Sequence, residues 1–175
     1  MSRIRFALLL CLVASVSVAT TAQTKPEKNY KNKYQNIEVT RFDVAAGNEV
    51  PPEYLDELAK DVANQLRDTK KFKQVIRAGE TAPVAADPAA STLRLTGTIT
   101  KFKKGSRAKR YLVGFGAGAT KMIVHVKFAD ASTGEVLFED DVDGKVFIGL
   151  FGGDSKGATN GVAKDIGKVA KKEFF

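Results

Sequence analysis

The sequence is poor in two residue types on which many metal sites and nucleophilic enzymes depend. Its 175 residues include one histidine, His125, and one cysteine, Cys11. Because Cys11 lies in an apolar N-terminal segment with the features of a cleavable leader, the remaining chain has no cysteine. This absence excludes disulfides, iron–sulfur clusters, thiolate zinc sites and cysteine nucleophiles there. The stability of the fold must therefore come from packing.

The N-terminal apolar run, Phe6 to Val18, is too short to cross a bilayer as a permanent helix. Two arginines precede it and small residues follow it up to Ala22, which is the pattern of a secretory signal peptide. We expect residues 1–22 to be a signal peptide, the protein to be exported to the periplasm or the medium, and no permanent transmembrane helix. A lipid anchor is not expected, because Cys11 lies inside the run rather than at its end.

Removal of 22 residues leaves 153, the size of one ordinary domain. The formal charge falls from +8 to +6, because the leader takes two arginines with it. Outside the cytoplasm, the anions that a basic protein meets are phospholipid head groups, lipopolysaccharide and other envelope polymers rather than chromosomal DNA. A basic surface also serves solubility alone. We predict a lysine-rich, solvated tether over residues 23–36 and a single domain over residues 37–175.

Two segments have the apolar spacing of helices. Pro51 and Pro52 open the first, which ends between Asp68 and Lys71. Its apolar stripe consists of Leu55, Leu58, Ala59, Val62, Ala63 and Leu66. The second begins at Ala158, and two glycines each weaken it by about 1 kcal/mol relative to alanine. It should be helical only because it docks on a sheet.

Alternating apolar residues predict strands over residues 37–44, 92–100, 120–128 and 136–146, with a short strand near Val75. An alanine- and proline-rich segment, residues 78–91, is predicted to be a surface loop. The fold class we predict is α/β (α+β): a single two-layer sandwich in the order β-α-β-β-β-β-α. Its sheet should be mixed or mostly antiparallel, with both helices on one face.

The last two strands should form a hairpin about the turn at residues 130–134. We predict a register with Phe128 opposite Val136 on the inner face. The outer-face pairs of this register are His125 with Glu139 and Lys121 with Asp143. Asp140 then falls on the inner face, which requires a bulge or the edge of the sheet.

Several motifs that suggest chemistry do not fit their context. Residues 114–119, GFGAGA, match a permissive dinucleotide pattern, but a strand follows where a phosphate site needs a helix. We therefore expect no dinucleotide and no other cofactor. His125 is expected on an exposed strand face without a nucleophile to activate. The acidic residues at 139–143 alternate along a strand instead of converging in a calcium loop, and we expect them to pair with lysines.

Two sets of residues remain as candidate sites. The first is a basic run that can contact an anionic surface, with simple solvation as the alternative: Lys103, Lys104, Arg107, Lys109 and Arg110. It lacks the interleaved aromatic residues of a single-strand nucleic-acid binder. The second is an interaction or self-association patch in two glycine-aromatic runs, with tight packing as the alternative: Tyr111, Leu112, Phe115, Leu150 and Phe151.

At these residues the chain resembles a bacterial family, domain of unknown function 4410. The shared motifs are L-x-L-x-G at 93–97, RYLVGFGAG at 110–118, D-x-x-T-G-x-V at 130–136 and GLFGG at 149–153. The resemblance implies an exported, often lipid-anchored envelope protein with no assigned activity, although this chain lacks the anchor cysteine. The layout is also similar to small domains of the curli-secretion channel subunit and of penicillin-binding-protein activator lipoproteins, which implies interaction rather than catalysis.

The leading hypothesis is a non-enzymatic exported envelope protein that binds a protein partner or an anionic surface. One alternative is a hydrolase or transferase that uses Asp140 and Asp141, which requires both carboxylates to converge in a pocket. Another is a secreted single-stranded nucleic-acid binder, whose binding would depend on salt.

Overall fold

The computed structural model of the chain describes residues 30–80, 91–103, 121–145 and 156–175. The predicted signal peptide lies outside the described residues, as do residues 81–90 of the predicted loop. The described elements are β1 (Asn36–Val39), β2 (Asp43–Val44), α1 (Pro52–Asp68), β3 (Gln74–Arg77), β4 (Thr92–Lys103), β5 (Lys121–Asp130), β6 (Val136–Lys145) and α3 (Lys156–Phe174).

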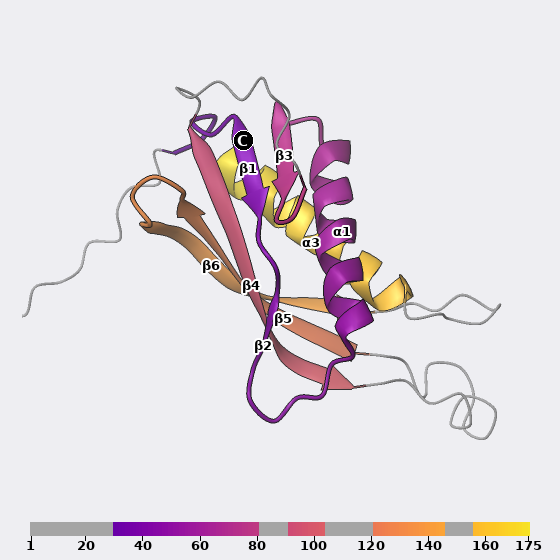
Figure 1. Cartoon of the computed structure of the whole chain (residues 1–175). Coiled ribbons are helices and arrows are strands. Elements are labelled where there is room, and N and C mark those ends of the chain that lie inside the picture. Colours follow the sequence, from indigo (N-terminus) through magenta and orange to yellow (C-terminus); the bar gives the residue numbers. More distant parts are fainter. Residues whose placement is uncertain (1–29, 81–90, 104–120, 146–155) are drawn as a thin grey trace, which may run out of the picture.

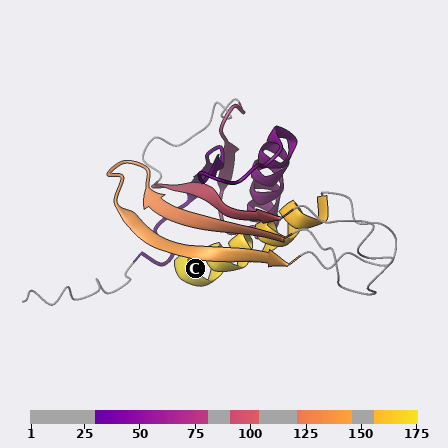
Figure 2. The same ribbon diagram turned by 90° about the horizontal axis from the view of Figure 1, so that it is seen from below.

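These elements form two layers, an open six-stranded sheet and two helices that cover one of its faces (Figures 1 and 2). The strand order is β3-β1-β4-β5-β6, and β2 pairs with β4 beyond the end of β1. Strands β1, β2 and β3 run parallel to their neighbours, whereas β4, β5 and β6 are antiparallel. The predicted α+β class, the mixed sheet and the helices on one face are confirmed. The first predicted strand is divided into β1 and β2.

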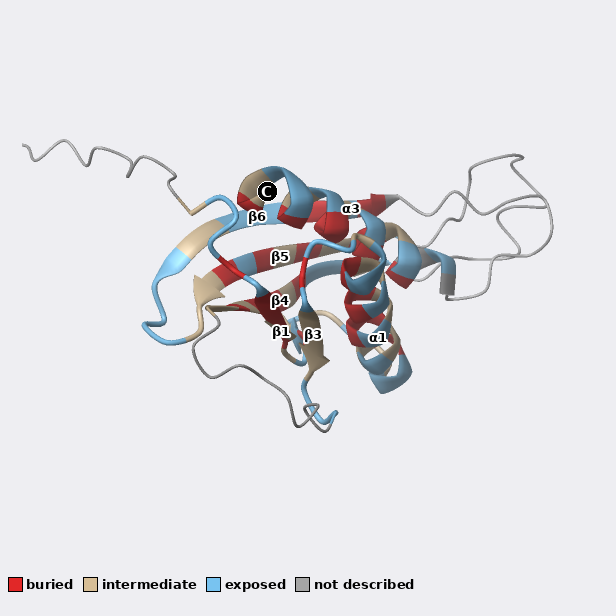
Figure 3. Cartoon of the chain, turned by 90° about the horizontal axis from the view of Figure 1, so that it is seen from above, coloured by how far each residue is buried: buried red, intermediate tan, exposed pale blue. Residues whose placement is uncertain are grey.

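The core lies between the layers and follows the predicted patterns (Figure 3). On β4, Leu93, Leu95 and Ile99 are fully buried, and the inner face of β5 continues this layer. The predicted stripe of α1 is buried except for the half-buried Leu55. Helix α3 is joined to α1 by a hydrogen bond from the Thr159 hydroxyl to Asp61, at 2.6 Å. The helical periodicity therefore identified the docking faces correctly.

Two glycines of the sheet permit close approach of other elements. A Cβ at Gly97 would overlap with the ring of Phe42, the buried residue between β1 and β2. A Cβ at Gly144 would overlap with Val162 of α3 and lie 2.8 Å from its backbone nitrogen. The glycine of the L-x-L-x-G motif thus makes room for an aromatic ring, and the glycine of β6 for a helix backbone.

The end of the predicted tether is packed into the domain. Tyr34 is 2% exposed, and its hydroxyl donates a 2.8 Å hydrogen bond to Asp130. Asp130 also accepts hydrogen bonds from the backbone of Ser132 and Thr133, at 2.8 and 3.1 Å. These donors, the Ser132 hydroxyl first and Tyr34 next, hold the pKa of Asp130 well below its usual range. Residues 30–36 therefore belong to the fold instead of preceding it.

The predicted hairpin exists, but its register was wrong by two residues. Phe128 pairs with Phe138 instead of Val136, because the turn is longer than expected and Leu137 forms a bulge. The longer turn shifts the pairing by one residue, and the bulge shifts it by one more. Because a shift of two residues leaves each side chain on the same face, the strand beyond the bulge has the predicted inner and outer faces. Between the bulge and the turn the phase is inverted, and Val136 is 49% exposed instead of inward-facing.

Candidate functional site

The face of the sheet opposite the helices is polar, and ion pairs neutralise its middle. Arg94 lies 2.9 Å from Glu38, and Lys127 lies 3.2 Å from Glu139. The Lys127 hydrogen bond and charge lower the pKa of Glu139. The prediction of a lysine partner is confirmed for Glu139, although the residue directly opposite it is Lys127 instead of His125. For Asp141 the prediction was wrong, because its partner is His125.

His125 lies in the same network of the open face. Its Nδ1 is 2.8 Å from Asp141, and its Nε2 is 3.7 Å from Glu139. The directly opposite residue on β6 is Asp141, and Thr98 is the neighbour on β4. The ring therefore links β5 to β6 through carboxylates of β6. It lies on the predicted face, but the residue opposite it is Asp141 instead of the predicted Glu139.

The carboxylates of Asp140 and Asp141 do not converge. Successive residues of a strand point to opposite faces, so Asp141 joins His125 while Asp140 falls on the inner face opposite Val126. Asp140 remains exposed because β6 is an edge strand, and its carboxylate accepts a 2.8 Å hydrogen bond from the backbone N–H of Asp141. The prediction that the edge of the sheet keeps Asp140 accessible to solvent is confirmed. Because Asp140 and Asp141 lie on opposite faces, they do not form a catalytic carboxylate pair.

In the part of the chain that the structure describes, no three histidine, cysteine or acidic side chains are placed together to hold a metal ion.

Lysines dominate one end of the open face, at the lower right of Figure 1. Strand β4 ends at Lys103, directly opposite Lys121, and Lys121 in turn pairs in register with Lys145. Lys101 lies one row back, opposite Ile123. Three of these lysines are exposed and form no ion pair with a described residue; we call them the lysine end: Lys101, Lys103 and Lys121.

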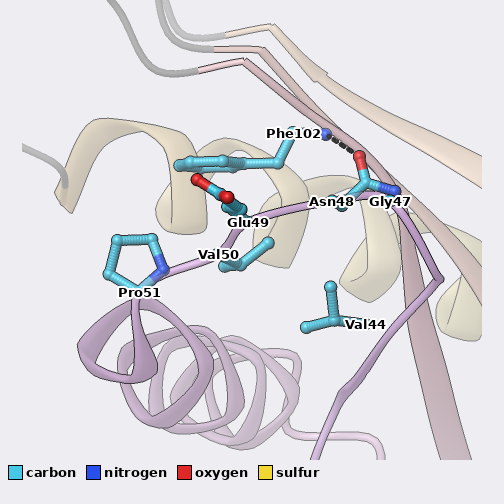
Figure 4. A pocket seen from close by; sticks show the side chains of 7 residues that line it. All are labelled: Val44, Gly47, Asn48, Glu49, Val50, Pro51 and Phe102. Carbon is cyan, nitrogen blue, oxygen red and sulfur yellow. Dashed lines mark hydrogen bonds between the residues drawn. The ribbon is translucent and has the colours of Figure 1, made fainter.

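An open hollow of about 830 Å³ lies beside the lysine end, between Phe102 and residues 44–51 (Figure 4). Its walls include Val44, Val50 and the half-buried Phe102 ring, with the Glu49 carboxylate beside that ring. The ring packs edge-on against Tyr54 of α1, with centroids 5.3 Å apart. The lining of this open hollow is mixed, since Asn48 and Glu49 lie among the apolar residues.

Asn48 fixes the wall of this hollow to the sheet. Its Oδ1 accepts a 3.2 Å hydrogen bond from the Phe102 N–H, and its Nδ2 donates to the Thr100 carbonyl, also at 3.2 Å. Thr100 is the bulged residue of β4, where the register with β5 shifts. A single amide side chain therefore satisfies the carbonyl of the bulged residue and an N–H two residues beyond it.

Of the predicted site residues, only Lys103 is described, and it is exposed at the end of β4. The others lie outside the described residues: Lys104, Arg107, Lys109, Arg110, Tyr111, Leu112, Phe115, Leu150 and Phe151. Strand β4 ends at Lys103, at the start of the basic run that precedes the first glycine-aromatic run. Strand β6 ends at Lys145, two residues before the second, and both strand ends lie at the same end of the sheet.

Sequence reasoning missed Asn48 and the alignment of Lys103 with Lys121. The signal for Asn48 was its position in a glycine-containing turn before Pro51, where a side-chain amide often bonds to backbone. The lysine alignment requires the strand register, which the bulge at Thr100 changes. No local pattern gives that register.

None of the helices in the described ranges combines the length and the apolar character that a bilayer crossing needs. Comparison with curated proteins gives no match.

Solved structures resemble the fold. A protein of Xanthomonas campestris, XCC0632, described under domain of unknown function 330, aligns with a TM-score of 0.51 and 12% identity over 85% of this chain and 90% of its own. The PelC dodecamer of Paraburkholderia phytofirmans gives 0.50 and 14% over 77% and 86%. The lipoprotein GNA1162 of Neisseria meningitidis gives 0.43 and 13% over 78% and 96%.

The sequence itself gives a more specific result than the fold. Residues 20–149 match the family described as domain of unknown function DUF4410, which is most of the chain and includes β1 to β6. The L-x-L-x-G motif of β4 and the D-x-x-T-G turn after β5 lie within this match. In the structure Gly97 makes room for a ring, and Asp130 accepts a hydrogen bond from the backbone of Thr133 in the turn. The chain belongs to the DUF4410 family.

Proposed function

We propose that this protein is a non-enzymatic, exported envelope protein that binds a protein partner at the end of the sheet where β4 and β6 end. The observation that carries the proposal is the hollow beside Phe102, a partly apolar and accessible surface next to the lysine end. The charged side chains of the middle of the sheet are engaged with one another, as His125 is with Asp141 and Lys127 with Glu139.

The two predicted sets of residues have complementary roles in this proposal. The patch in the glycine-aromatic runs supplies apolar contacts to the partner: Tyr111, Leu112, Phe115, Leu150 and Phe151. The basic run supplies attraction to anionic envelope material: Lys103, Lys104, Arg107, Lys109 and Arg110. Apolar burial contributes affinity, whereas the cations increase the rate of encounter and favour acidic partners.

Export is the part of the proposal that rests on sequence alone, since the predicted signal peptide lies outside the described residues. Fractionation of the producing bacterium is expected to place the protein outside the cytoplasm. The absence of a lipid anchor stays a prediction from the position of Cys11. Labelling with a radioactive fatty acid tests it, and incorporation of the label would contradict it.

A pull-down from envelope extracts tests the binding role. The chain is compared with a triple variant, Phe115→Ser, Leu150→Ser and Phe151→Ser, and with Val136→Ser as the control. Val136 is an exposed apolar residue at the opposite end of β6, so this control removes an apolar side chain away from the proposed surface. We expect the control to retain the partner and the triple variant to lose it. Retention by a triple variant with an unchanged unfolding midpoint would contradict the proposal.

Self-association through the same surface is the second candidate function. It is favoured by the similarity in fold to PelC, which is a dodecamer in its solved structure. Analytical ultracentrifugation of the purified protein is expected to show an assembly that the triple serine variant lacks. A monomer at all concentrations would count against this candidate without affecting the first.

A further inference from the structure

We propose that the lysine end is a docking surface for the anionic head groups of a phospholipid bilayer. The inference deepens the proposed envelope role and rests on it only for export. Its residues belong to the open face of the sheet, whereas the partner hollow lies on the side of Phe102, so the two surfaces are separable by mutation.

The charge along the open face changes from balanced to basic. In the middle rows each cation has a carboxylate partner, as Lys127 has Glu139 and Arg94 has Glu38. In the last two rows the positions are Lys103, Lys121 and Lys145, then Lys101, Ile123 and Asp143. Asp143 is the single acidic position in these rows and forms no ion pair with a described residue. The face therefore has an unbalanced positive end.

This arrangement costs stability in the isolated domain. Residues directly opposite on antiparallel strands have Cβ atoms about 5 Å apart, and like charges at such positions are destabilising. Lys103 and Lys121 occupy one such pair, with Lys145 next in the row. An external anion removes that repulsion and gains an attraction to each lysine. A face that is only solvated does not need lysines opposite one another, because cations alternating with carboxylates would be equally soluble and more stable.

The shape and composition of the lysine end favour a membrane over a nucleic acid. Its lysines project from adjacent strands of one sheet face, with the half-buried Ile123 between them. The nearest aromatic residue of β4, Phe102, is opposite Met122 on the inner face, so no described ring is available to stack on a base here. A broad row of lysine side chains with an apolar centre suits a plane of head groups.

Vesicle co-sedimentation tests the proposal with a matched pair of variants. The test variant is K101Q/K103Q/K121Q. The control is K60Q/K164Q/K171Q, which removes the same charge from exposed positions on the two helices, in the layer opposite the open face. Vesicles contain phosphatidylcholine alone or with about 30% phosphatidylglycerol, at low and at physiological salt.

The purified protein is expected to bind the anionic vesicles and not the neutral ones. Each lysine of the test variant is worth about fivefold in the partition coefficient, so its loss of binding is on the order of 100-fold, while the control loses far less. Equal losses in the two variants, or no binding by the unmodified protein, would overturn the proposal. Retention of short oligonucleotides or polyphosphate without vesicle binding would overturn the choice of a membrane. Because Lys103 also belongs to the basic run of the proposed function, the triple serine variant of the pull-down separates the two proposals, since it is expected to lose the partner and to keep vesicle binding.

Discussion

Replacement of Gly97 by alanine tests how the core closes over β4. The added Cβ would overlap with the ring of Phe42, which is 1% exposed, and would lie 3.2 Å from Val124. Overpacking of this kind costs about 1–3 kcal/mol. Alanine recovers about 0.5–1 kcal/mol, because it loses less backbone entropy than glycine on folding. Since a buried ring has little room to move, we expect a net loss of about 2 kcal/mol and a fall in Tm of roughly 4–8 °C.

A double-mutant cycle identifies the cause of that loss. Phe42→Leu alone should cost about 1–2 kcal/mol, because it removes buried volume. Combined with Gly97→Ala it should cost at least about 1 kcal/mol less than the sum of the single effects, because the smaller side chain makes room for the Cβ. Urea denaturation followed by circular dichroism measures all four proteins. Additive losses, or an unchanged stability of Gly97→Ala, would show that the ring does not close over this glycine.

Three further predictions concern the rest of the fold. Gly144→Ala should destabilise the protein by about 2–3 kcal/mol in urea denaturation. Adding Val162→Ala should not restore the stability, because the new Cβ also meets the backbone of Val162. Full recovery in the double variant would contradict this packing. Tyr34→Phe should cost about 1–2 kcal/mol at pH 7, because Asp130 loses a donor from a buried hydroxyl. Since the pKa of Asp130 is depressed on folding, its stabilisation is present above its unfolded-state pKa near about 4 and is lost as the pH falls through the lower folded value. Denaturation at decreasing pH should therefore show a smaller acid-dependent loss for Tyr34→Phe than for the unmodified protein, and an equal loss would refute the coupling. Asp140→Val removes a charge from the inner side of the edge strand β6, so it should allow two copies of the protein to pair edge to edge and should raise the sedimentation coefficient. An unchanged coefficient would show that Asp140 does not prevent such pairing.

Local patterns were sufficient for most of the architecture. The alternation of Leu93, Leu95 and Ile99 gave the buried face of β4, and the stripe of α1 gave its docking face. Both patterns show which face of a helix or strand is buried, because the spacing of apolar residues matches the period of that element. The order of elements followed from the same reading, apart from the division of the first strand at Phe42.

Features set by contacts between distant residues were not accessible from the sequence. Tyr34 belongs to a polar segment of the sequence, and the hydrogen-bond partner of its buried hydroxyl group, Asp130, lies 96 residues further along the chain. The hairpin register depended on the Leu137 bulge, which apolar spacing does not encode. At the candidate site, Lys103 was singled out for its basic neighbours in sequence. Its relation to Lys121 depends on the second bulge, at Thr100, which Asn48 stabilises.

The central claim is that the protein acts by binding at the end of the sheet that carries Lys103, and photo-cross-linking in growing cells tests it most directly. A photoreactive residue replaces Lys103 at the end of β4 or, as the control, Lys164 on the exposed side of α3. The account predicts adducts with an envelope protein or phospholipid from position 103 and none from position 164. Adducts from position 164 alone, equal adducts from both positions, or none from position 103 would contradict it.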